Sequence, residues 1–489
     1  MTFSFDNSYA RLPERFYSRV APTAVREPRV VKVNRALATL LGLDADFLAS
    51  PEGAQILAGN VVPSGAASIA LAYAGHQFGS FAGQLGDGRA ILLGEVVGTD
   101  GRRRDIQLKG AGRTPYSRGG DGRAALGPVL REYLVSEAMA ALGVPTTRAL
   151  AAVTTGEIVR RDEPLPGAVM VRVASSHLRV GTFELLAARK DDEGLRALTH
   201  YALERHYPDS LGAPNEALAL LDRVIAAQAS LVARWLGLGF IHGVMNTDNT
   251  SISGETIDYG PCAFLDEYDP QKTFSSIDHR GRYAYANQPR IALWNLTRLA
   301  ETLIPLIDAD QDRAVAGATE LLDTFAERFG EAHGRVLRAK VGLTIEDAAD
   351  GPLLADLLER MASNEVDFTL FFRGLCEAVA DPNRNAAVAS LFATPGAFHE
   401  WSERWRPRLA REPGSPADKA AAMRLVNPAF IPRNHRIEEI IVSARRGDFT
   451  PFETFSRVLE HPYDDQPEHA SWREPPEREQ RVTATFCGT

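Results

Sequence analysis

The chain has 489 residues, of which 45% are hydrophobic and 24% are charged, and these values argue against wholesale disorder and allow two or three lobes. Its 54 Lys and Arg residues against 63 Asp and Glu residues give a formal net charge of −9, which argues against a general binder of nucleic acid or anionic membrane. Three cysteines, Cys262, Cys376 and Cys487, are too few for a disulfide scaffold or a four-cysteine zinc site. No signal peptide or apolar run of about 18 residues is visible, so we expect a cytoplasmic protein.

The chain divides into four expected parts: an N-terminal extension (1–60), a mixed α/β lobe (61–185), a larger helical lobe (186–462) and a charged, proline-rich tail (463–489). In chain order, the elements predicted are a short helix within 31–43, an amphipathic helix over 124–143, two strands within 150–175, and long helices after 186. Residues 249–258 interrupt the helical pattern and predict a small hairpin that turns at Gly254. The predicted fold class is α+β with two lobes.

Several large enzyme classes are excluded because their motifs are absent. The sequence contains no Walker-type phosphate loop, no G-x-G-x-x-G between a strand and a helix, no H-E-x-x-H and no G-x-S-x-G.

A glycine-rich segment precedes an apolar strand at 90–93. Gly83, Gly86 and Gly88 allow backbone N–H groups to approach a phosphate, and Arg89 adds positive charge. The alternative for these glycines is a plain β-turn between two strands.

A basic segment follows, with eight basic and two acidic residues between 102 and 131. In an acidic chain, this local charge points to a compact polyanion such as a nucleoside triphosphate, although a solvated basic loop is the alternative. Lys109 ends an alternating strand, and Glu132 lies 23 residues later on the amphipathic helix. Protein kinases pair a strand lysine with a helix glutamate in this way to hold phosphates, and Glu137 is a second candidate on the same helix.

The segment 240–264 has the spacing of a kinase catalytic loop. His242 opens the loop, Asn249 follows seven residues later, and Asp258 begins a D-Y-G at the place of the kinase D-F-G. Asn249 and Asp258 could share one hard cation. The kinase base position is Val244, which cannot accept a proton, and Asp248 is the only nearby carboxylate that could replace it.

These blocks together resemble the selenoprotein O family of pseudokinases. The resemblance covers nearly the whole chain and rests on AYAGHQFGSFAGQLGDGRA, QLKGAGRTPYSRGGDGRAALGPVLREYL, VRVASSHLRVGTFE, GVMNTDNTSISGETIDYGPCAF and NPAFIPRNHRIEEII. It implies a protein-kinase-like bilobal fold and a protein adenylyltransferase that moves AMP from ATP to Ser, Thr or Tyr hydroxyls of proteins.

The resemblance also implies a role for each matching residue. It places Gly86, Gly88 and Arg89 over the nucleotide, Lys109 on phosphate and paired with Glu132, Asp121 and Gly122 on the nucleotide, and Arg172 and Arg179 on the terminal phosphates. Asp248 is the implied proton acceptor, and Asn249 and Asp258 are the implied ligands of Mg²⁺ or Mn²⁺. In this inverted pose the α-phosphate faces the acceptor hydroxyl, and the arginines neutralise the departing pyrophosphate.

The resemblance further implies a regulatory disulfide between Cys262 and Cys487, whereas the alternative is two unrelated free thiols. Cys376 reads as a residue of a helical core. Three other functions stay open: a Mn²⁺-dependent uridylyltransferase that uses UTP, a non-catalytic nucleotide-binding scaffold, and, ranked last, a small-metabolite kinase. The expected partners are the nucleotide and protein substrates, and a C-terminal strap that reaches the segment after Asp258 would suit a monomer.

Overall fold

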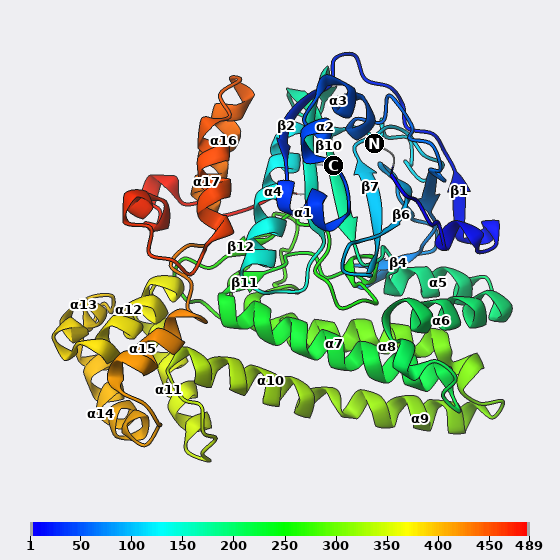
Figure 1. Ribbon diagram of the computed structural model, residues 1–489. Coiled ribbons are helices and arrows are strands. Elements are labelled where there is room, and N and C mark those ends of the chain that lie inside the picture. Colours follow the sequence, from blue (N-terminus) through cyan, green and yellow to red (C-terminus); the bar gives the residue numbers. More distant parts are fainter. Residues whose placement is uncertain (1–2, 487–489) are drawn as a thin grey trace.

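The computed structural model describes residues 3–486. The first part of the chain builds an antiparallel eight-stranded sheet, and helices make up most of the chain after residue 180 (Figure 1). The fold class is therefore α+β, as predicted. No helix among the described residues is long and apolar enough to cross a membrane.

The strand order in the large sheet is β1-β3-β6-β7-β10-β9-β2, with β8 paired to β10. These strands and the small pairs β4–β5 and β11–β12 have the following bounds: β1 Tyr17–Arg19, β2 Arg29–Val33, β3 Ile69–Leu71, β4 Gly75–Gln77, β5 Ser80–Ala82, β6 Ala90–Val97, β7 Arg103–Lys109, β8 Ala124–Ala125, β9 Arg148–Arg160, β10 Pro164–Ala174, β11 Phe240–Ile241 and β12 Ala263–Phe264. The strands β1 and β2, both from the first 60 residues, form the two ends of this order.

Helices cover both faces of the sheet. Successive strand residues point to opposite faces, so Ile91 and Leu93 of β6 pack in one cluster with α1 (Arg35–Leu40), α2 (Ala45–Leu48) and α3 (Pro51–Leu57), while Leu92 packs in the cluster of α4 (Leu126–Ala141). The sheet is therefore buried on both sides, and α4 carries Glu132 along one of them.

The remaining helices form two groups around separate cores (Figure 1). The first group packs under the sheet and consists of α5 Val180–Ala188, α6 Asp192–His206, α7 Glu216–Leu238, α8 Gln288–Ile307, α9 Gln311–Asp323 and α10 Phe325–Lys340. The second group consists of α11 Asp350–Ser363, α12 Phe368–Ala380, α13 Asn385–Ala389, α14 Gly396–Ala410 and α15 Pro416–Arg424. The chain then returns to α4 through α16 Asn434–Arg445 and α17 Thr450–Glu460.

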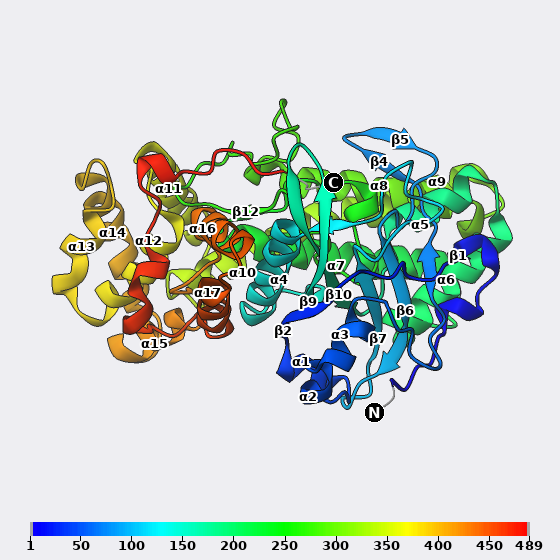
Figure 2. The ribbon, with the colours of Figure 1, turned by 90° about the horizontal axis from the view of Figure 1, so that it is seen from above.

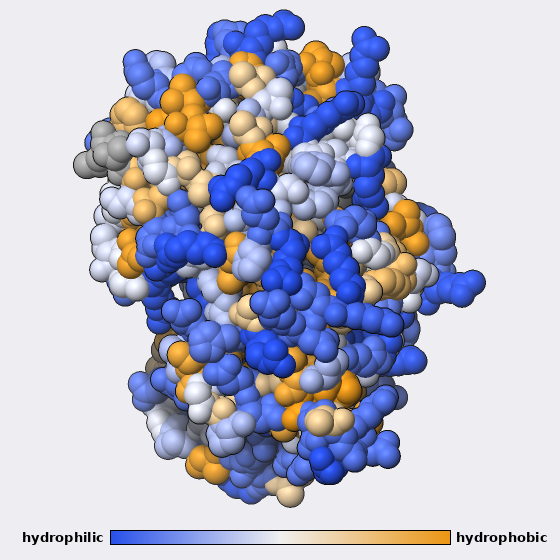
Figure 3. All heavy atoms as spheres, turned by 90° about the vertical axis from the view of Figure 1, so that its right-hand side faces the viewer, coloured by the Kyte–Doolittle hydropathy of each residue, from blue (hydrophilic) through white to orange (hydrophobic). Residues whose placement is uncertain are grey.

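Cys376 is buried in α12, as expected of a residue in a helical core. On the side of the molecule where α5 and α6 lie, the surface is mostly hydrophilic and its hydrophobic patches are separated (Figure 3).

Two local predictions were correct only in part. The helix expected within 31–43 begins only after the edge strand β2, because Asn34 caps the first turn of α1 by accepting a hydrogen bond from the Leu37 N–H at 3.0 Å. Residues 249–258 do turn at Gly254, whose φ is +75°, but their two arms do not pair with each other. Ser251 bridges to Arg179 and Thr256 bridges to Thr146, so each arm takes its backbone partner from elsewhere.

Candidate active site

The carboxylate of Asp258 lies at the centre of three cationic side chains. Lys109 Nζ is 2.8 Å and Arg172 Nη1 is 2.6 Å from Asp258 Oδ1, and Arg179 Nη1 is 3.1 Å from Oδ2. The cations come from the end of β7, from β10 and from the residue before α5. Burial opposes ionisation of Asp258, but the three positive charges outweigh it and hold the pKa of this carboxyl well below its usual range.

Glu132 is the second carboxylate of this cluster. Its Oε2 lies 2.6 Å from Lys109 Nζ and its Oε1 lies 3.3 Å from Arg172 Nη1. The other candidate, Glu137, is instead engaged with Arg148, at 2.6 Å. Of the two helix glutamates, the structure therefore places Glu132 against the strand lysine.

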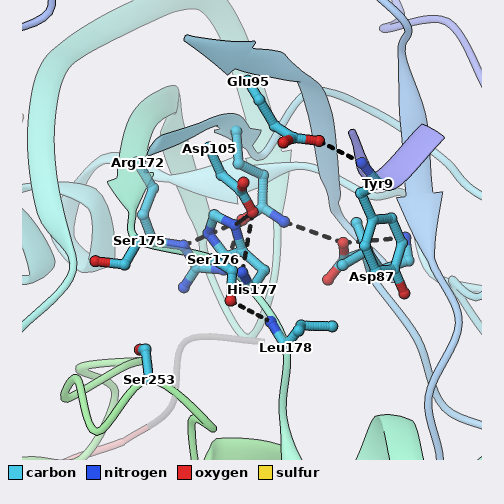
Figure 4. Close-up of polar contacts among 12 residues, drawn as sticks. Tyr9, Asp87, Glu95, Asp105, Arg172, Ser175, Ser176, His177, Leu178 and Ser253 are labelled. Carbon is cyan, nitrogen blue, oxygen red and sulfur yellow. Dashed lines mark hydrogen bonds and ion pairs between the residues drawn. The ribbon is translucent and has the colours of Figure 1, made fainter. Parts of the chain in front are cut away.

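The buried guanidinium of Arg172 is held in its orientation by Gln107, whose Oε1 accepts bonds from Nε at 3.1 Å and from Nη2 at 2.6 Å. Further hydrogen bonds and ion pairs connect the polar side chains next to Arg172 (Figure 4). Asp105 accepts from His177 Nδ1 at 2.9 Å and pairs with Arg205 of α6 at 2.7 Å. This network ties the sheet to the helices beneath it, close to the cationic cluster.

Asp248 is contacted by the same nitrogen of Arg179 that pairs with Asp258, since Nη1 also donates to the Asp248 backbone carbonyl at 2.8 Å. Asp248 is buried, with an exposed fraction of 8%. Its Oδ2 accepts a hydrogen bond from Gln77 Nε2 at 3.1 Å. Its Oδ1 is buried and has no hydrogen-bond partner. Burial raises the pKa of Asp248 to about 6, against the opposing charge of Arg179.

The β4–β5 hairpin, within the loop between β3 and β6, lies directly on the loop 242–249. The His76 N–H donates to Thr247 Oγ1 at 2.6 Å, and the Phe78 N–H donates to Asn246 Oδ1 at 3.0 Å. At Gly75, an added Cβ would lie 2.9 Å from the Cβ of Asp248, so only glycine allows this approach. No sequence pattern predicted a role for these hairpin residues, although they stand in the block that begins AYAGHQFG.

Gly86 and Gly88 lie where the same loop approaches β6, and Arg89, half-buried, precedes that strand. Gly86 has φ of +127°, and an added Cβ there would lie 2.5 Å from the ring of Tyr116. The loop 110–123 therefore packs tightly over these glycines, and Thr114 Oγ1 donates to the Asp87 carbonyl at 2.6 Å.

Asp87 is a buried residue of this site that the sequence analysis missed. Its Oδ1 lies 3.7 Å from Arg179 Nη2, and its Oδ2 accepts from Gln107 Nε2 at 3.0 Å. Arg179 also stacks on the ring of Tyr73, with its guanidinium carbon 4.5 Å from the ring centroid. Asp87 lies between Gly86 and Gly88 in the sequence. A single acidic residue in a turn does not indicate that it will be buried in the folded protein.

Asp121 and Gly122 are not drawn into the cationic cluster. Asp121 pairs with Arg161 at 2.9 Å near the surface. Gly122 has φ of +69°, and an added Cβ would lie 2.1 Å from the Gly112 carbonyl oxygen, so the turn requires glycine. His242 is likewise structural: it is buried, and its Nε2 lies 2.9 Å from the Ile257 carbonyl oxygen.

Asn249 and Asp258 carry the oxygen types that a hard divalent cation takes, and in this structure both oxygens of Asp258 pair with cationic side chains. Asn249 Nδ2 donates to the Val244 carbonyl at 3.0 Å, which leaves the amide oxygen of Asn249 to act as a ligand. Amide and carboxylate oxygens are the ligands that Mg²⁺ prefers, and it commonly takes one or two carboxylates together with substrate phosphates. Within residues 3–486, no group of three or more His, Cys, Asp or Glu side chains forms a separate metal cluster.

Cys262 is buried four residues after Asp258, and burial raises the pKa of its thiol to about 11. The C-terminal segment reaches this region, since Thr485 Oγ1 donates to the Pro261 carbonyl at 2.6 Å and Thr485 bridges to Ser275. Cys487 lies outside the described residues, so its predicted pairing with Cys262 stays a prediction.

The chain is similar over its whole length to known proteins. The model of the family described as protein adenylyltransferase SelO matches residues 1–460. A protein named "Protein nucleotidyltransferase YdiU" from Methylorubrum populi is 64% identical over 494 residues, covering 100% of this chain and 99% of its own length. Proteins of the same name from Rhodopseudomonas palustris and Bradyrhizobium diazoefficiens are each 61% identical over 488 residues, with the same coverage. The chain therefore belongs to the SelO family and is a protein nucleotidyltransferase.

Proposed function

We propose that this protein transfers AMP from ATP to Ser, Thr or Tyr hydroxyls of other proteins, on a kinase-like bilobal fold. One observation carries the proposal: three cations converge on Asp258, and one of them, Arg179, also donates to the backbone carbonyl of Asp248, whose buried carboxylate has an unpartnered oxygen. Such an arrangement offers phosphate binding and a general base side by side.

In this proposal the triphosphate enters with its terminal phosphates among the cations. Lys109, Arg172 and Arg179 bind the β- and γ-phosphates, and the loops that carry Gly86, Gly88, Arg89, Asp121 and Gly122 hold the rest of the nucleotide. Guanidinium groups that are already oriented, as Gln107 orients Arg172, stabilise the developing charge on pyrophosphate without reorganisation. The α-phosphorus then faces the acceptor hydroxyl.

The acceptor oxygen forms a new bond to the α-phosphorus, and the bond between that phosphorus and the bridging oxygen of the β-phosphate breaks. Asp248 takes the hydroxyl proton on Oδ1, and pyrophosphate leaves with the bonding electron pair. With a pKa of about 6, this carboxyl is mostly ionised at neutral pH and is still basic enough to accept the hydroxyl proton. Val244, at the kinase base position, has no such capacity.

Asn249 and Asp258 are the residues that would hold a divalent cation, Mg²⁺ or Mn²⁺. When bound, such a cation neutralises phosphate charge. The same proposal includes a redox link between Cys262 and Cys487, supported by the position of Thr485 beside Pro261.

The experiment is incubation of the protein with ATP and Mg²⁺, followed by intact-mass spectrometry and by labelling with α- or γ-labelled ATP. We expect a mass increase of AMP, label from α-labelled ATP alone, and loss of label in Asp258→Ala. Label from γ-labelled ATP would identify a kinase instead. Label only from α-labelled UTP with Mn²⁺ would identify a uridylyltransferase, since the relatives' name specifies no base. Nucleotide binding without any labelled product would identify a scaffold.

A further inference from the structure

A stacked arrangement of two arginines and a tryptophan lies beside the β4–β5 hairpin, outside the phosphate cluster. The guanidinium carbons of Arg282 and Arg298 lie 4.7 and 4.9 Å from the centroid of the Trp294 ring. His76 of the hairpin meets the same indole edge-on at 5.3 Å between ring centroids. Stacking on an aromatic face orients a guanidinium while leaving its N–H edges available for an anion.

The guanidinium of Arg282 forms no ion pair in the part of the chain that the structure describes, and the acidic contact of this residue is made by its backbone N–H, which donates to Asp278 Oδ1 at 2.9 Å. No Asp or Glu oxygen lies within ion-pair distance of its guanidinium, and its Nε is buried without a hydrogen-bond partner. By contrast, Arg298 pairs with Glu301 at 2.6 Å. Gly79, with φ of +86°, brings the hairpin turn against the Arg282 guanidinium, where an added Cβ would lie 3.5 Å from its central carbon. An oriented, uncompensated arginine is a ready binding group for a carboxylate.

This arginine is connected to the loop that carries Asp248. The next residue, Tyr283, donates from its hydroxyl to Asn246 Oδ1 at 2.6 Å, two residues before Asp248. From the other side, Gln77 of the hairpin donates to Asp248 itself. A group bound at Arg282 would therefore lie close to a hydroxyl presented to Asp248.

The surrounding surface has the charge and polarity of a site for an acidic segment. Residues 278–298 contain four arginines and one acid, Asp278, whose carboxylate accepts from the backbone N–H groups of Arg282 and Tyr283, in a chain whose net charge is −9. Two large hydrophobic residues near this stretch are exposed: Phe81 of β5, with an exposed fraction of 49%, and Ile277, just before the stretch, with 61%. Figure 2 shows β4 and β5 projecting at the edge of the molecule next to α8, the helix that carries Trp294 and Arg298. Positive charge with isolated apolar contacts favours an acidic polypeptide over an apolar one.

We propose that Arg282 binds a side-chain carboxylate of the protein substrate, and that it thereby selects acceptor hydroxyls with a neighbouring Asp or Glu. This inference rests on the proposed AMP transfer and names its substrate class. Arg282 acts here as a specificity residue that is separate from the cations around Asp258, so it should affect the protein substrate and leave the nucleotide unaffected.

The test uses two synthetic peptide libraries with a central Ser, Thr or Tyr that differ only in Glu or Gln at the flanking positions. Transfer from α-labelled ATP is measured with the full-length wild type, with Arg282→Gln, and with Arg335→Gln, an exposed arginine of α10 outside this surface that serves as the matched control. We expect the wild type to prefer the Glu library about tenfold in kcat/KM, in line with one charge-assisted contact. Arg282→Gln should raise KM for the Glu library and remove the preference, with KM for ATP unchanged within about twofold.

The outcomes distinguish a failure of the proposed role of Arg282 from a failure of the proposed AMP transfer. Equal labelling of both libraries by the wild type, or a preference that survives in Arg282→Gln, would overturn the role of Arg282 while leaving AMP transfer intact. A tenfold rise in KM for ATP in Arg282→Gln would assign Arg282 to the nucleotide and likewise overturn it. The wild-type preference is measured without any substitution, so misfolding of a variant cannot conceal the answer. Absence of label from both libraries and from the protein itself would overturn the proposed function along with this inference.

Discussion

Gln77 Nε2 donates a hydrogen bond to Asp248 Oδ2 at 3.1 Å, and this contact joins the β4–β5 hairpin to the loop that holds the proposed base. One oxygen of the carboxylate is thereby fixed, and the other, Oδ1, is left buried without a partner. An acceptor that is oriented and desolvated in this way is prepared to take a proton.

Replacement of Asp248 by Asn tests this base directly. The variant keeps the shape and the Gln77 contact but cannot accept the proton, so we expect kcat for AMP transfer to fall by about 10²–10⁴-fold with little change in the KM for ATP. Transfer from α-labelled ATP gives both constants. Asp209→Asn, at an exposed position, is the control and should behave as the wild type. Full activity in Asp248→Asn would show that the proton goes elsewhere.

The pH dependence of kcat/KM reports the pKa values of the free enzyme. Because burial raises the pKa of Asp248 to about 6 and the ionised form is the active base, kcat/KM should rise with pH up to about 6 and level off above it. The Gln77 hydrogen bond lowers this pKa, so Gln77→Leu should move the midpoint to higher pH. A midpoint that is identical in the two proteins would contradict the positioning role of Gln77.

Asp258→Asn should abolish transfer and also destabilise the free protein. The substitution leaves Lys109, Arg172 and Arg179 without their shared carboxylate, and breaking a buried ion pair costs about 3–5 kcal/mol. Urea unfolding measures this loss. Metal-free ATP supplies phosphate charge to the same cations, so it should still bind, as calorimetry in EDTA would detect. A variant as stable as the wild type would show that the cluster is solvated rather than buried.

Lys340 provides a prediction about stability that is independent of the reaction. The residue is 3% exposed, its Nζ lies 4.3 Å from the ring centroid of Phe372, and burial lowers its pKa to about 7. The unfolded chain holds this proton up to about pH 10, so between pH 7 and 10 it binds more protons than the folded protein. Stability should therefore rise with pH in this range, by up to about 1.4 kcal/mol per pH unit from this group.

Lys340→Met should remove that slope and raise the unfolding free energy at pH 7. Urea unfolding at pH 7 and pH 9 measures both effects, and Lys419→Met, at a half-buried position, is the control. Parallel pH dependence in wild type and Lys340→Met would show that Lys340 stays charged in the folded protein.

A local sequence pattern is sufficient to predict an element when the residues of that element alone specify it. The helix over 124–143 was predictable because apolar residues recur at helical spacing and Gly143 ends it, and the structure has α4 at Leu126–Ala141. The 249–258 segment shows the opposite case. Its turn at Gly254 is local, but its arms pair with Arg179 and Thr146, which no local pattern indicates.

The amino-acid sequence by itself determined the α+β class, the family, and a short set of candidate residues, because composition, periodicity and motif spacing are local properties of the chain. Only the tertiary structure decided which helix glutamate meets Lys109, that Asp87 and Gln77 belong to the site, and that Asp121 lies apart from the cationic cluster. These are contacts between residues far apart in the chain. Burial, and with it the pKa of Asp248, depends on how such segments pack rather than on their neighbours in sequence.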